Sequence, residues 1–150
     1  MRALVQRVLE ASVEVGGRIT GQIGPGLLIL LGVRNGDTSK EVQFVAGKCL
    51  DLRIFEDQDG KMNRSVRDQA GSVLVVSQFT LYGDCRKGRR PSFIDAAPPT
   101  ASEPLYEAFV GCMAESGLRT AQGVFGAHMK VRLLNDGPVT VIVEKEASDP

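Results

Sequence analysis

The chain has 150 residues, of which 43% are hydrophobic, and its 18 basic residues balance its 18 acidic residues. This length suits a single domain over residues 1–150 that buries a core without needing disulfides or metal ions to fold. A net charge of zero excludes a protein that coats nucleic acid through a general positive field, so any nucleic-acid contact requires a local basic patch.

The first third of the chain predicts three strands. Over residues 1–15 the odd positions are mostly apolar and the even positions more polar, which is typical of a long strand with one buried face. Gly16 and Gly17 predict a hairpin turn into a second strand over residues 18–22. Residues 27–33 are apolar on both faces and therefore predict a central strand.

Arg7 interrupts the apolar face of the first strand. Strict alternation places its guanidinium on the buried side, between Val5 and Leu9. Burying a charged group is costly unless its hydrogen-bond donors are satisfied. Two arrangements are therefore open: a β-bulge turns Arg7 outward, or Arg7 stays inside and donates to partners such as backbone carbonyls.

A helix, a polar hairpin and a buried strand are predicted in the middle of the chain. Residues 38–41 fit a capping box. Apolar residues then follow at helical spacing, namely Val42, Val45, Ala46, Cys49 and Leu50. The polar stretch 56–70 contains Asp59-Gly60 and predicts a turn or hairpin, whereas residues 73–76 predict a strand with no polar face.

A second helix is predicted after a long loop. Residues 83–99 are rich in proline, glycine and basic residues, which is typical of a loop. Residues 100–103 fit another capping box, and the helix is expected to end near Gly117. Its buried stripe is predicted at Leu105, Phe109, Val110 and Met113.

The last third predicts a hairpin. Apolar and polar residues alternate over 129–133 and again over 139–143, and residues 135–138 predict the turn between them. Cis peptide bonds concentrate at X-Pro in tight turns, so Gly137-Pro138 is either a plain turn or a cis site. Together the elements predict an α/β protein of the α+β type, with two main helices on a strongly curved, mostly antiparallel, barrel-like sheet.

The rarer residue types argue against a metal centre, a disulfide framework and a membrane anchor. The three cysteines, Cys49, Cys85 and Cys112, are far apart in the sequence, and His128 is the only histidine. Scattered cysteines in an odd number are typical of reduced thiols, and no zinc-ligand spacing is present. The longest apolar run, residues 26–33, is too short to span a membrane. We expect a cytoplasmic protein without metal, cofactor or membrane contact.

The segment Ser77-Gln78-Phe79-Thr80-Leu81 leaves the buried strand and enters a loop. It offers two hydroxyls, and its backbone N–H groups could bind a developing oxyanion. A hydroxyl nucleophile needs an adjacent base, and His128 lies on a different element, so a Ser-His-Asp triad has no local support. The same residues also fit a strand that simply ends in polar side chains.

Residues 84–90, with the sequence DCRKGRR, carry four positive charges and one negative charge. Such a run fits either a solvated loop or a set of phosphate contacts, because arginine and lysine bind phosphate oxygens. In the second case the contacts would be made by Arg86, Lys87, Arg89 and Arg90.

Two of these segments resemble motifs of the D-aminoacyl-tRNA deacylase family. Residues 77–81 resemble its SQFTL motif, and residues 135–140 resemble its NxGPxT motif. The likeness extends in the family's order along nearly the whole chain, including residues 3–8, 83–93 and 123–127. The chain departs from the family pattern at His128, where an acidic residue is expected, and in the tail after Val143.

The resemblance implies a homodimeric hydrolase that acts at the 3′ end of aminoacylated tRNA and has no DNA partner. It would hydrolyse D-aminoacyl-tRNA and mischarged glycyl-tRNA, and so proofread chirality in translation. The implied catalytic residues of one subunit are Ser77, Gln78, Phe79 and Thr80. Gly137 and Pro138 of the other subunit, joined by a cis bond, would exclude L-amino acids. The residues expected to support the motif or pocket are Arg7, Phe125, Met129 and Asn135.

The resemblance assigns no side chain a compulsory role in proton transfer. The 2′-OH of the terminal ribose is thought to assist the attacking water, which would make the enzyme dependent on RNA. Two other functions fit the residues: a conventional serine or threonine hydrolase that uses Ser77 or Thr80, and an RNA-binding module without catalysis.

Overall fold

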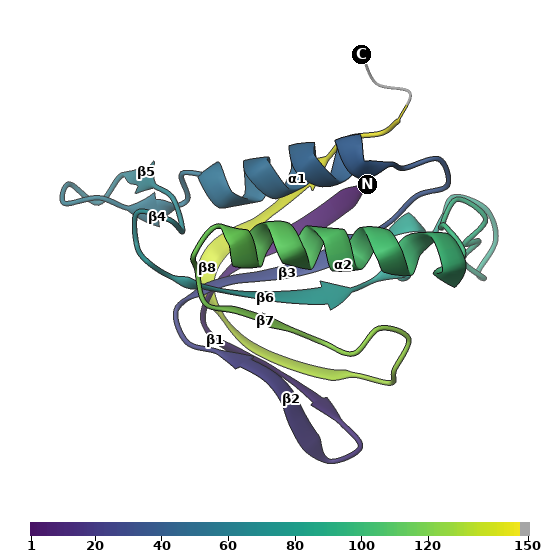
Figure 1. Ribbon diagram of the computed structural model, residues 1–150, viewed down its shortest axis with the longest axis horizontal. Coiled ribbons are helices and arrows are strands. Elements are labelled where there is room, and N and C mark those ends of the chain that lie inside the picture. The colour runs from purple at the N-terminus through teal and green to yellow at the C-terminus, as the bar shows by residue number, and fades with distance from the viewer. Residues whose placement is uncertain (148–150) are drawn as a thin grey trace.

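One long N-terminal strand, β1, organises the main sheet, and two long helices pack against that sheet (Figure 1). The structure is a computed structural model, and it describes residues 1–147, so residues 148–150 of the divergent tail lie outside it. The strands are β1 (Arg2–Val15), β2 (Arg18–Ile23), β3 (Gly26–Gly32), β4 (Phe55–Glu56), β5 (Met62–Arg64), β6 (Ser72–Ser77), β7 (Thr120–Gln122) and β8 (Lys130–Glu144). The helices are α1 (Ser39–Asp51), the short 3₁₀-helix η1 (Phe79–Tyr82) and α2 (Pro99–Glu115).

The main sheet is built on β1, which is long enough to pair with three strands. It pairs antiparallel with β2, β3 and β8, whereas the β3–β6 and β6–β7 pairs are parallel. The sheet curls until β2 lies against β7, where a Cβ atom on Gly21 would stand only 2.6 Å from the carbonyl oxygen of Gln122. The predicted α+β fold with a curved, barrel-like sheet is confirmed, with two parallel pairs inside a sheet that is otherwise antiparallel.

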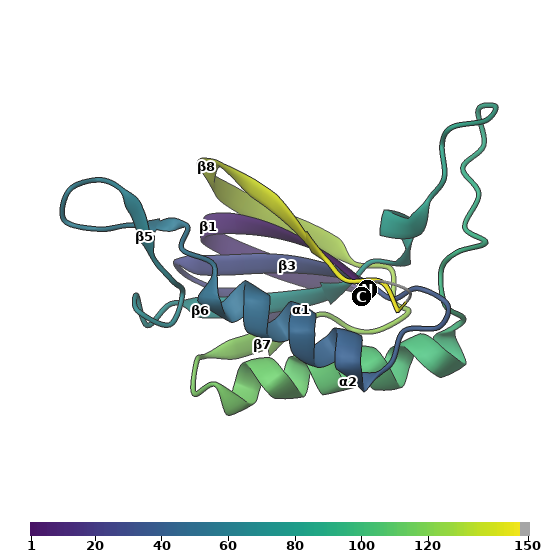
Figure 2. The same ribbon diagram turned by 90° about the horizontal axis from the view of Figure 1, so that it is seen from above.

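Both long helices cover the same face of the sheet (Figure 2). The α1 stripe predicted from the sequence is buried at all five positions, and the capping box of Thr38 and Glu41 is present. Phe109 and Met113 of α2 are buried as predicted, together with Tyr106, which the predicted stripe left out. A second, smaller core lies within the curl of the sheet and consists of Val8, Ala11, Val13, Ile23, Leu28, Leu74 and Val76.

The predicted start of α2 is wrong. The helix begins at Pro99 with Pro98 as its N-cap, so the expected capping box at residues 100–103 lies inside the first turn. Proline fits the first helical position because its φ is already helical and its missing N–H would have no partner there. Within this first turn the Ser102 hydroxyl donates to the Pro98 carbonyl at 3.1 Å.

The predicted C-terminal hairpin is also wrong. β8 is one continuous strand that pairs with β1 on both sides of the expected turn, with Gln6 opposite Thr140 and Val8 opposite Asn135. Residues 136–139 therefore bulge out opposite a single residue, Arg7. The turn residues do not reverse the chain because β1 offers a partner to both halves of β8.

Candidate functional site

The segment that resembles SQFTL lies where β6 ends and η1 begins. The N–H of Gln78 donates to the Leu31 carbonyl at 2.8 Å, which fixes the end of β6 against the neighbouring strand β3. Gly32 lets η1 approach closely, because a Cβ atom there would lie 3.1 Å from the Gln78 carbonyl and 3.2 Å from Leu81 and Tyr82 side-chain atoms. The segment is therefore mounted on the most buried part of the sheet.

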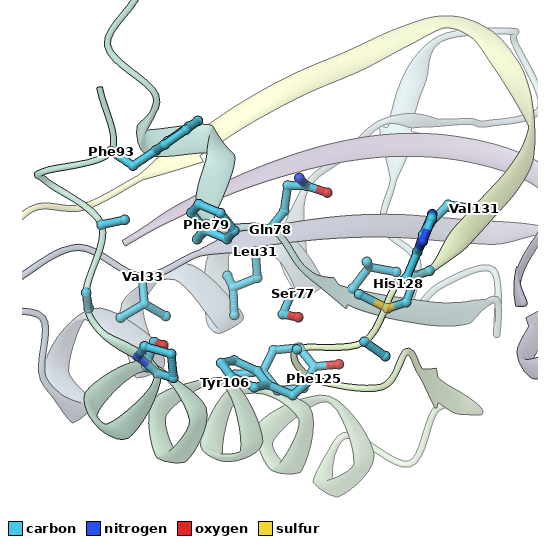
Figure 3. A pocket seen from close by; sticks show the side chains of 18 residues that line it. Leu31, Val33, Ser77, Gln78, Phe79, Phe93, Tyr106, Phe125, His128 and Val131 are labelled. Carbon is cyan, nitrogen blue, oxygen red and sulfur yellow. The ribbon is translucent and has the colours of Figure 1, made fainter. Parts of the chain in front are cut away.

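Two backbone donors stand at the start of η1. The first N–H groups of a helix have no acceptor within the helix, and in η1 these belong to Phe79 and Thr80. The Gln78 amide donates to the Thr80 hydroxyl, which holds that side chain beside its own helix turn. The hydroxyl of Ser77 faces the cavity in front of the segment (Figure 3).

That cavity has a volume of about 560 Å³ and is mostly apolar. Its floor includes Tyr106 of α2 and Phe125, whose ring centroids lie 5.7 Å apart. The Tyr106 hydroxyl donates to the Val75 carbonyl at 3.0 Å, and burial raises the pKa of this phenol, so it stays neutral. The lining is formed by Leu31, Val33, Val76, Ser77, Gln78, Phe79, Phe93, Ala96, Ala97, Pro99, Ser102, Tyr106, Phe125, Gly126, Ala127, His128, Met129 and Val131.

No nucleophile with a base is assembled in this cavity. Its described lining contains no aspartate, glutamate, lysine or arginine. His128 belongs to the lining, yet no hydrogen bond within residues 1–147 joins it to Ser77 or Thr80. Over the same residues, no group of three or more histidine, cysteine or acidic side chains could hold a metal ion. The chemistry available here is hydrogen bonding from backbone donors in an uncharged enclosure.

The second predicted motif forms a separate cluster. The Gly137-Pro138 bond is cis, and both residues are exposed in the bulge of β8. Asn135 spans the base of the bulge, because its side-chain amide donates to the carbonyls of Arg7 at 2.9 Å and Val139 at 3.1 Å. A Cβ atom on Gly137 would lie 2.8 Å from the Asn135 side-chain oxygen, so a larger residue here would displace the Asn135 side chain that spans the bulge.

Arg7 holds the bulge from inside. Only 7% of the residue is exposed, and its guanidinium donates to the carbonyls of Ile54 at 2.7 Å and Asp136 at 3.1 Å. It also pairs with the Asp136 carboxylate at 3.1 Å. A bulge does occur in β1, but it comes after Arg7 and turns Leu9 outward to 48% exposure. Of the two arrangements left open by the sequence, the structure has the buried one.

The structure brings together some of the predicted site residues and separates others. Ser77, Gln78 and Phe79 share one cavity with Phe125 and Met129. Thr80 is next to this cavity but does not line it. The bulge residues Arg7, Asn135, Gly137 and Pro138 are not part of the lining either. Within one chain the two motifs therefore do not form a single site.

The basic residues lie on an arm over residues 83–97 that projects beyond the sheet (Figure 2). Asp84 and Ser92 pair across its stem with backbone hydrogen bonds of 2.7 and 3.0 Å. Arg86 pairs with Asp84 at 2.7 Å and lowers the pKa of that carboxyl to about 2. The sequence prediction named the basic residues of this arm but missed Phe93, which lines the cavity. Phe93 lies in a stretch rich in charged residues, and no motif or spacing there indicated that it lines a cavity.

Comparison with known proteins places the chain in a family. The family model described as D-Tyr-tRNA(Tyr) deacylase matches residues 4–144. The chain belongs to this deacylase family. A D-aminoacyl-tRNA deacylase of Brevibacillus brevis is 62% identical over 96% of this chain and 99% of its own length. One of Thermus aquaticus is 56% identical over 96% of this chain and 95% of its own length.

Two solved structures extend the deacylase comparison. A protein described as c-Myc DNA unwinding element binding protein is 43% identical, with a TM-score of 0.91 over 98% of this chain and 100% of its own. A probable eukaryotic D-amino acid tRNA deacylase superposes with a TM-score of 0.83 at 18% identity, over 96% of this chain and 98% of its own, which supports the fold. Within residues 1–147, no helix is long and apolar enough to cross a membrane.

Proposed function

We propose that this deacylase-family chain hydrolyses the ester bond between the 3′ end of a tRNA and a D-amino acid or glycine. The observation that carries the proposal is the start of η1, where the N–H groups of Phe79 and Thr80 stand beside an uncharged cavity. Donors fixed in this way stabilise the oxyanion that forms when an ester carbonyl is attacked. The relatives from Brevibacillus brevis and Thermus aquaticus, both more than half identical, are named D-aminoacyl-tRNA deacylase, which supports the D-amino acid part of the proposal.

The attacking group in this proposal is water, assisted by the 2′-OH of the terminal ribose. Ser77 and Thr80 have hydroxyls, but no base is bonded to either within the described residues, and the Thr80 hydroxyl accepts from Gln78. An unassisted serine or threonine hydroxyl is a weak nucleophile. The absence of aspartate, glutamate, lysine and arginine from the described lining fits a reaction in which the substrate supplies its own hydroxyl. Because DNA lacks that hydroxyl, DNA is not a substrate.

Chirality would be read by the bulge of a second subunit. Gly137 and Pro138 project from β8 and are exposed, while Arg7 and Asn135 hold the base of the bulge. If the bulge of one subunit caps the cavity of its partner, an L side chain collides with its backbone carbonyls. A D side chain points elsewhere and glycine has none, so both are admitted. Substrates are thus selected by steric exclusion of L-amino acids, and the protein does not need to bind the side chain of the D-amino acid specifically.

A homodimer is proposed because large apolar side chains of β8 are uncovered in the single chain. Ile142 is 60% exposed and Leu134 is 50% exposed on the strand that carries the bulge. Phe79, at the cavity that the bulge would cap, is 56% exposed. Apolar surface of this kind on an ordered strand is typical of a protein–protein interface. In a two-fold dimer each subunit covers the same face of the other.

A mixed dimer tests whether the bulge acts across the interface. One subunit carries Phe79→Pro, which removes a backbone donor, and the other carries Arg7→Ala, which releases the bulge. In this dimer only the Arg7→Ala subunit has a working cavity, and only the Phe79→Pro subunit has an intact bulge. If the bulge caps the partner's cavity, the two meet, and the mixed dimer keeps the parent ratio of D to L hydrolysis. The measurement is that ratio for dimers purified through two different affinity tags.

The control is the Arg7→Ala homodimer, in which both bulges are released and the ratio falls. A mixed dimer with the same low ratio as that homodimer would show that each bulge serves its own subunit. A monomer by light scattering at micromolar concentration would contradict the interface as well.

The basic arm is expected to bind tRNA phosphates. Replacing Lys87, Arg89 and Arg90 by glutamine should weaken the binding of all tRNAs, and each lost contact should lower the slope of log affinity against log salt by about 1. Arg86 should contribute less, because Asp84 already offsets its charge. Lys61→Gln, on the exposed β4–β5 hairpin at the far end of the molecule, is the matched control (Figure 1). An unchanged slope in the triple variant would make the arm a solvated loop.

Two other functions would give different results in the same assays. A binding module without catalysis would hold charged tRNA but leave the ester intact over many equivalents of substrate. A serine or threonine hydrolase would lose all turnover on replacement of Ser77 or Thr80 by alanine, whereas the present proposal expects turnover to persist in both variants.

As a step of translation proofreading, the reaction places the enzyme with the cytoplasmic tRNA pool.

A further inference from the structure

Two aromatic rings form one lip of the cavity and are left largely uncovered. Phe79 is 56% exposed and Phe93 is 40% exposed, and their ring centroids lie 5.2 Å apart at an interplanar angle of 73°. Both rings line the cavity, with Phe93 farther out along the arm (Figure 3). In the proposed dimer the bulge of the partner approaches Phe79, which leaves Phe93 as the outer aromatic surface of the site.

Phe93 is exposed although the backbone around it is anchored. The residue before it, Ser92, pairs with Asp84, and the carbonyl after it, on Ile94, accepts from the Asn35 side chain at 2.9 Å. Its ring also packs on Gly83, where a Cβ atom would lie 2.9 Å from the ring edge. A large ring held in place at the mouth of a cavity has a fixed face to offer to a ligand.

The charge around Phe93 indicates which ligand fits. The tip of the arm, between Asp84 and Ser92, carries four cations, namely Arg86, Lys87, Arg89 and Arg90. The described lining of the cavity on the other side of Phe93 holds none. Along this surface the cations of the arm are followed by the exposed Phe93 ring and then by the cavity. This order suits a single strand of nucleic acid, because its phosphates pair with cations and its bases stack on aromatic rings.

We propose that Phe93 stacks on the unpaired base that precedes the terminal nucleoside of the tRNA 3′ end. The inference rests on the proposed function, because the terminal nucleoside and its ester must occupy the cavity beside Phe79. The base before it then leaves the cavity over the lip and meets Phe93, and its phosphates run toward the arm. Stacking on one ring is tolerant of sequence, since every base has a π-face, and so it suits an enzyme that acts on many tRNAs.

A binding experiment tests the contact without requiring catalysis. The probe is uncharged tRNA with 2-aminopurine in place of the penultimate base, whose fluorescence is quenched when it stacks. Quenching is expected with the parent protein and with Phe93→Tyr, which keeps the ring. It should be lost with Phe93→Leu, which keeps only apolar volume. Phe44→Leu, at a ring on α1 that is 43% exposed and outside the cavity lining, is the matched control and should behave like the parent.

A kinetic experiment separates this contact from the proposed function itself. Phe93→Leu should raise the KM for D-aminoacyl-tRNA by about tenfold, a typical effect of losing one stacked base, and leave kcat unchanged. The effect of the same variant should be much smaller on a D-aminoacyl ester of adenosine alone, which has no preceding base. If the parent protein cleaves neither the adenosine ester nor D-aminoacyl-tRNA, the proposed function is wrong. The stacking assay is independent of that result.

Three outcomes would overturn the stacking proposal. Equal quenching with the parent and Phe93→Leu would show that the base does not contact the ring. A defect that persists on the adenosine ester, and grows from D-alanine to D-tyrosine, would assign Phe93 to the amino-acid side chain. Dissociation of Phe93→Leu into monomers by light scattering would assign the ring to the subunit interface.

Discussion

Replacement of Arg7 by alanine is expected to lower the ratio of D- to L-aminoacyl-tRNA hydrolysis by at least about tenfold, which corresponds to about 1.4 kcal/mol of lost discrimination. Arg7 donates to the carbonyl of Asp136, the residue that enters the exposed Gly137-Pro138 bulge. Steric exclusion of an L side chain requires the backbone of the bulge to stay in place to within about an ångström. If the bulge moves away from the cavity, the clash weakens and L-substrates can bind. The loss should therefore appear as faster cleavage of L-substrates.

The same substitution should also cost stability. It leaves the buried carbonyl of Ile54 and the carbonyl of Asp136 without their guanidinium donor. Each unpaired acceptor costs about 1–3 kcal/mol, so for the two carbonyls we expect a loss of about 2–6 kcal/mol in the free energy of unfolding, measured by urea denaturation.

Arg7→Lys separates the two effects. Lysine keeps the positive charge but cannot reach two carbonyls through a planar fork. We expect it to recover part of the stability and little of the discrimination. If Arg7→Ala folds, dimerises and still rejects L-aminoacyl-tRNA as firmly as the parent, the bulge is only a structural feature and selection occurs elsewhere.

Removal of the Phe79 N–H is expected to give the largest loss of turnover. Phe79→Pro deletes this donor at the first position of η1, a place where proline is tolerated in helices. The preceding residue, Gln78, has φ −147° and ψ 77°, outside the helical region that a following proline disfavours. Loss of one oxyanion donor costs about 10²–10³ in kcat.

Phe79→Ala is the matched control, because it removes the same ring but keeps the backbone N–H. The ratio of kcat between Phe79→Ala and Phe79→Pro therefore isolates the donor, and we expect it to lie at about 10²–10³. Similar kcat values for the two variants, with both folded by circular dichroism, would show that the Phe79 N–H does not take part in the reaction.

The parts of the fold that could be predicted are those set by local patterns. The alternation of residues 1–15 and the capping box at Thr38 each determine a local structure, and both occur as predicted. The α2 start was mispredicted because two candidate caps lie two residues apart, and Pro98-Pro99 defines the helix start better than Thr100.

The C-terminal strand could not be predicted from its own residues. A turn sequence such as 135–138 predicts a reversal when it is read locally, and the continuous β8 depends on its pairing with β1 more than a hundred residues away. Arg7 shows the same limit from the other side. The sequence indicated that its guanidinium needed partners, but Ile54 and Asp136 could be identified only from the fold.

The candidate site divides in the same way. The segment that resembles SQFTL and the Gly-Pro bulge were found as motifs, and one belongs to the cavity while the other stands apart within the chain. The cavity itself is built by side chains from α2, the arm and the loop before β8. Tyr106 and Phe93 line the cavity because of how the chain packs, and their spacing in the sequence did not predict this.

The most direct test of the account is the release of tyrosine from tRNA charged with either enantiomer. The protein is mixed at catalytic concentration with D-tyrosyl-tRNA or L-tyrosyl-tRNA, and free amino acid is measured over time. We expect many turnovers with the D-ester and no release above the uncatalysed rate with the L-ester. Equal rates for the two esters, or no turnover with either, would contradict it.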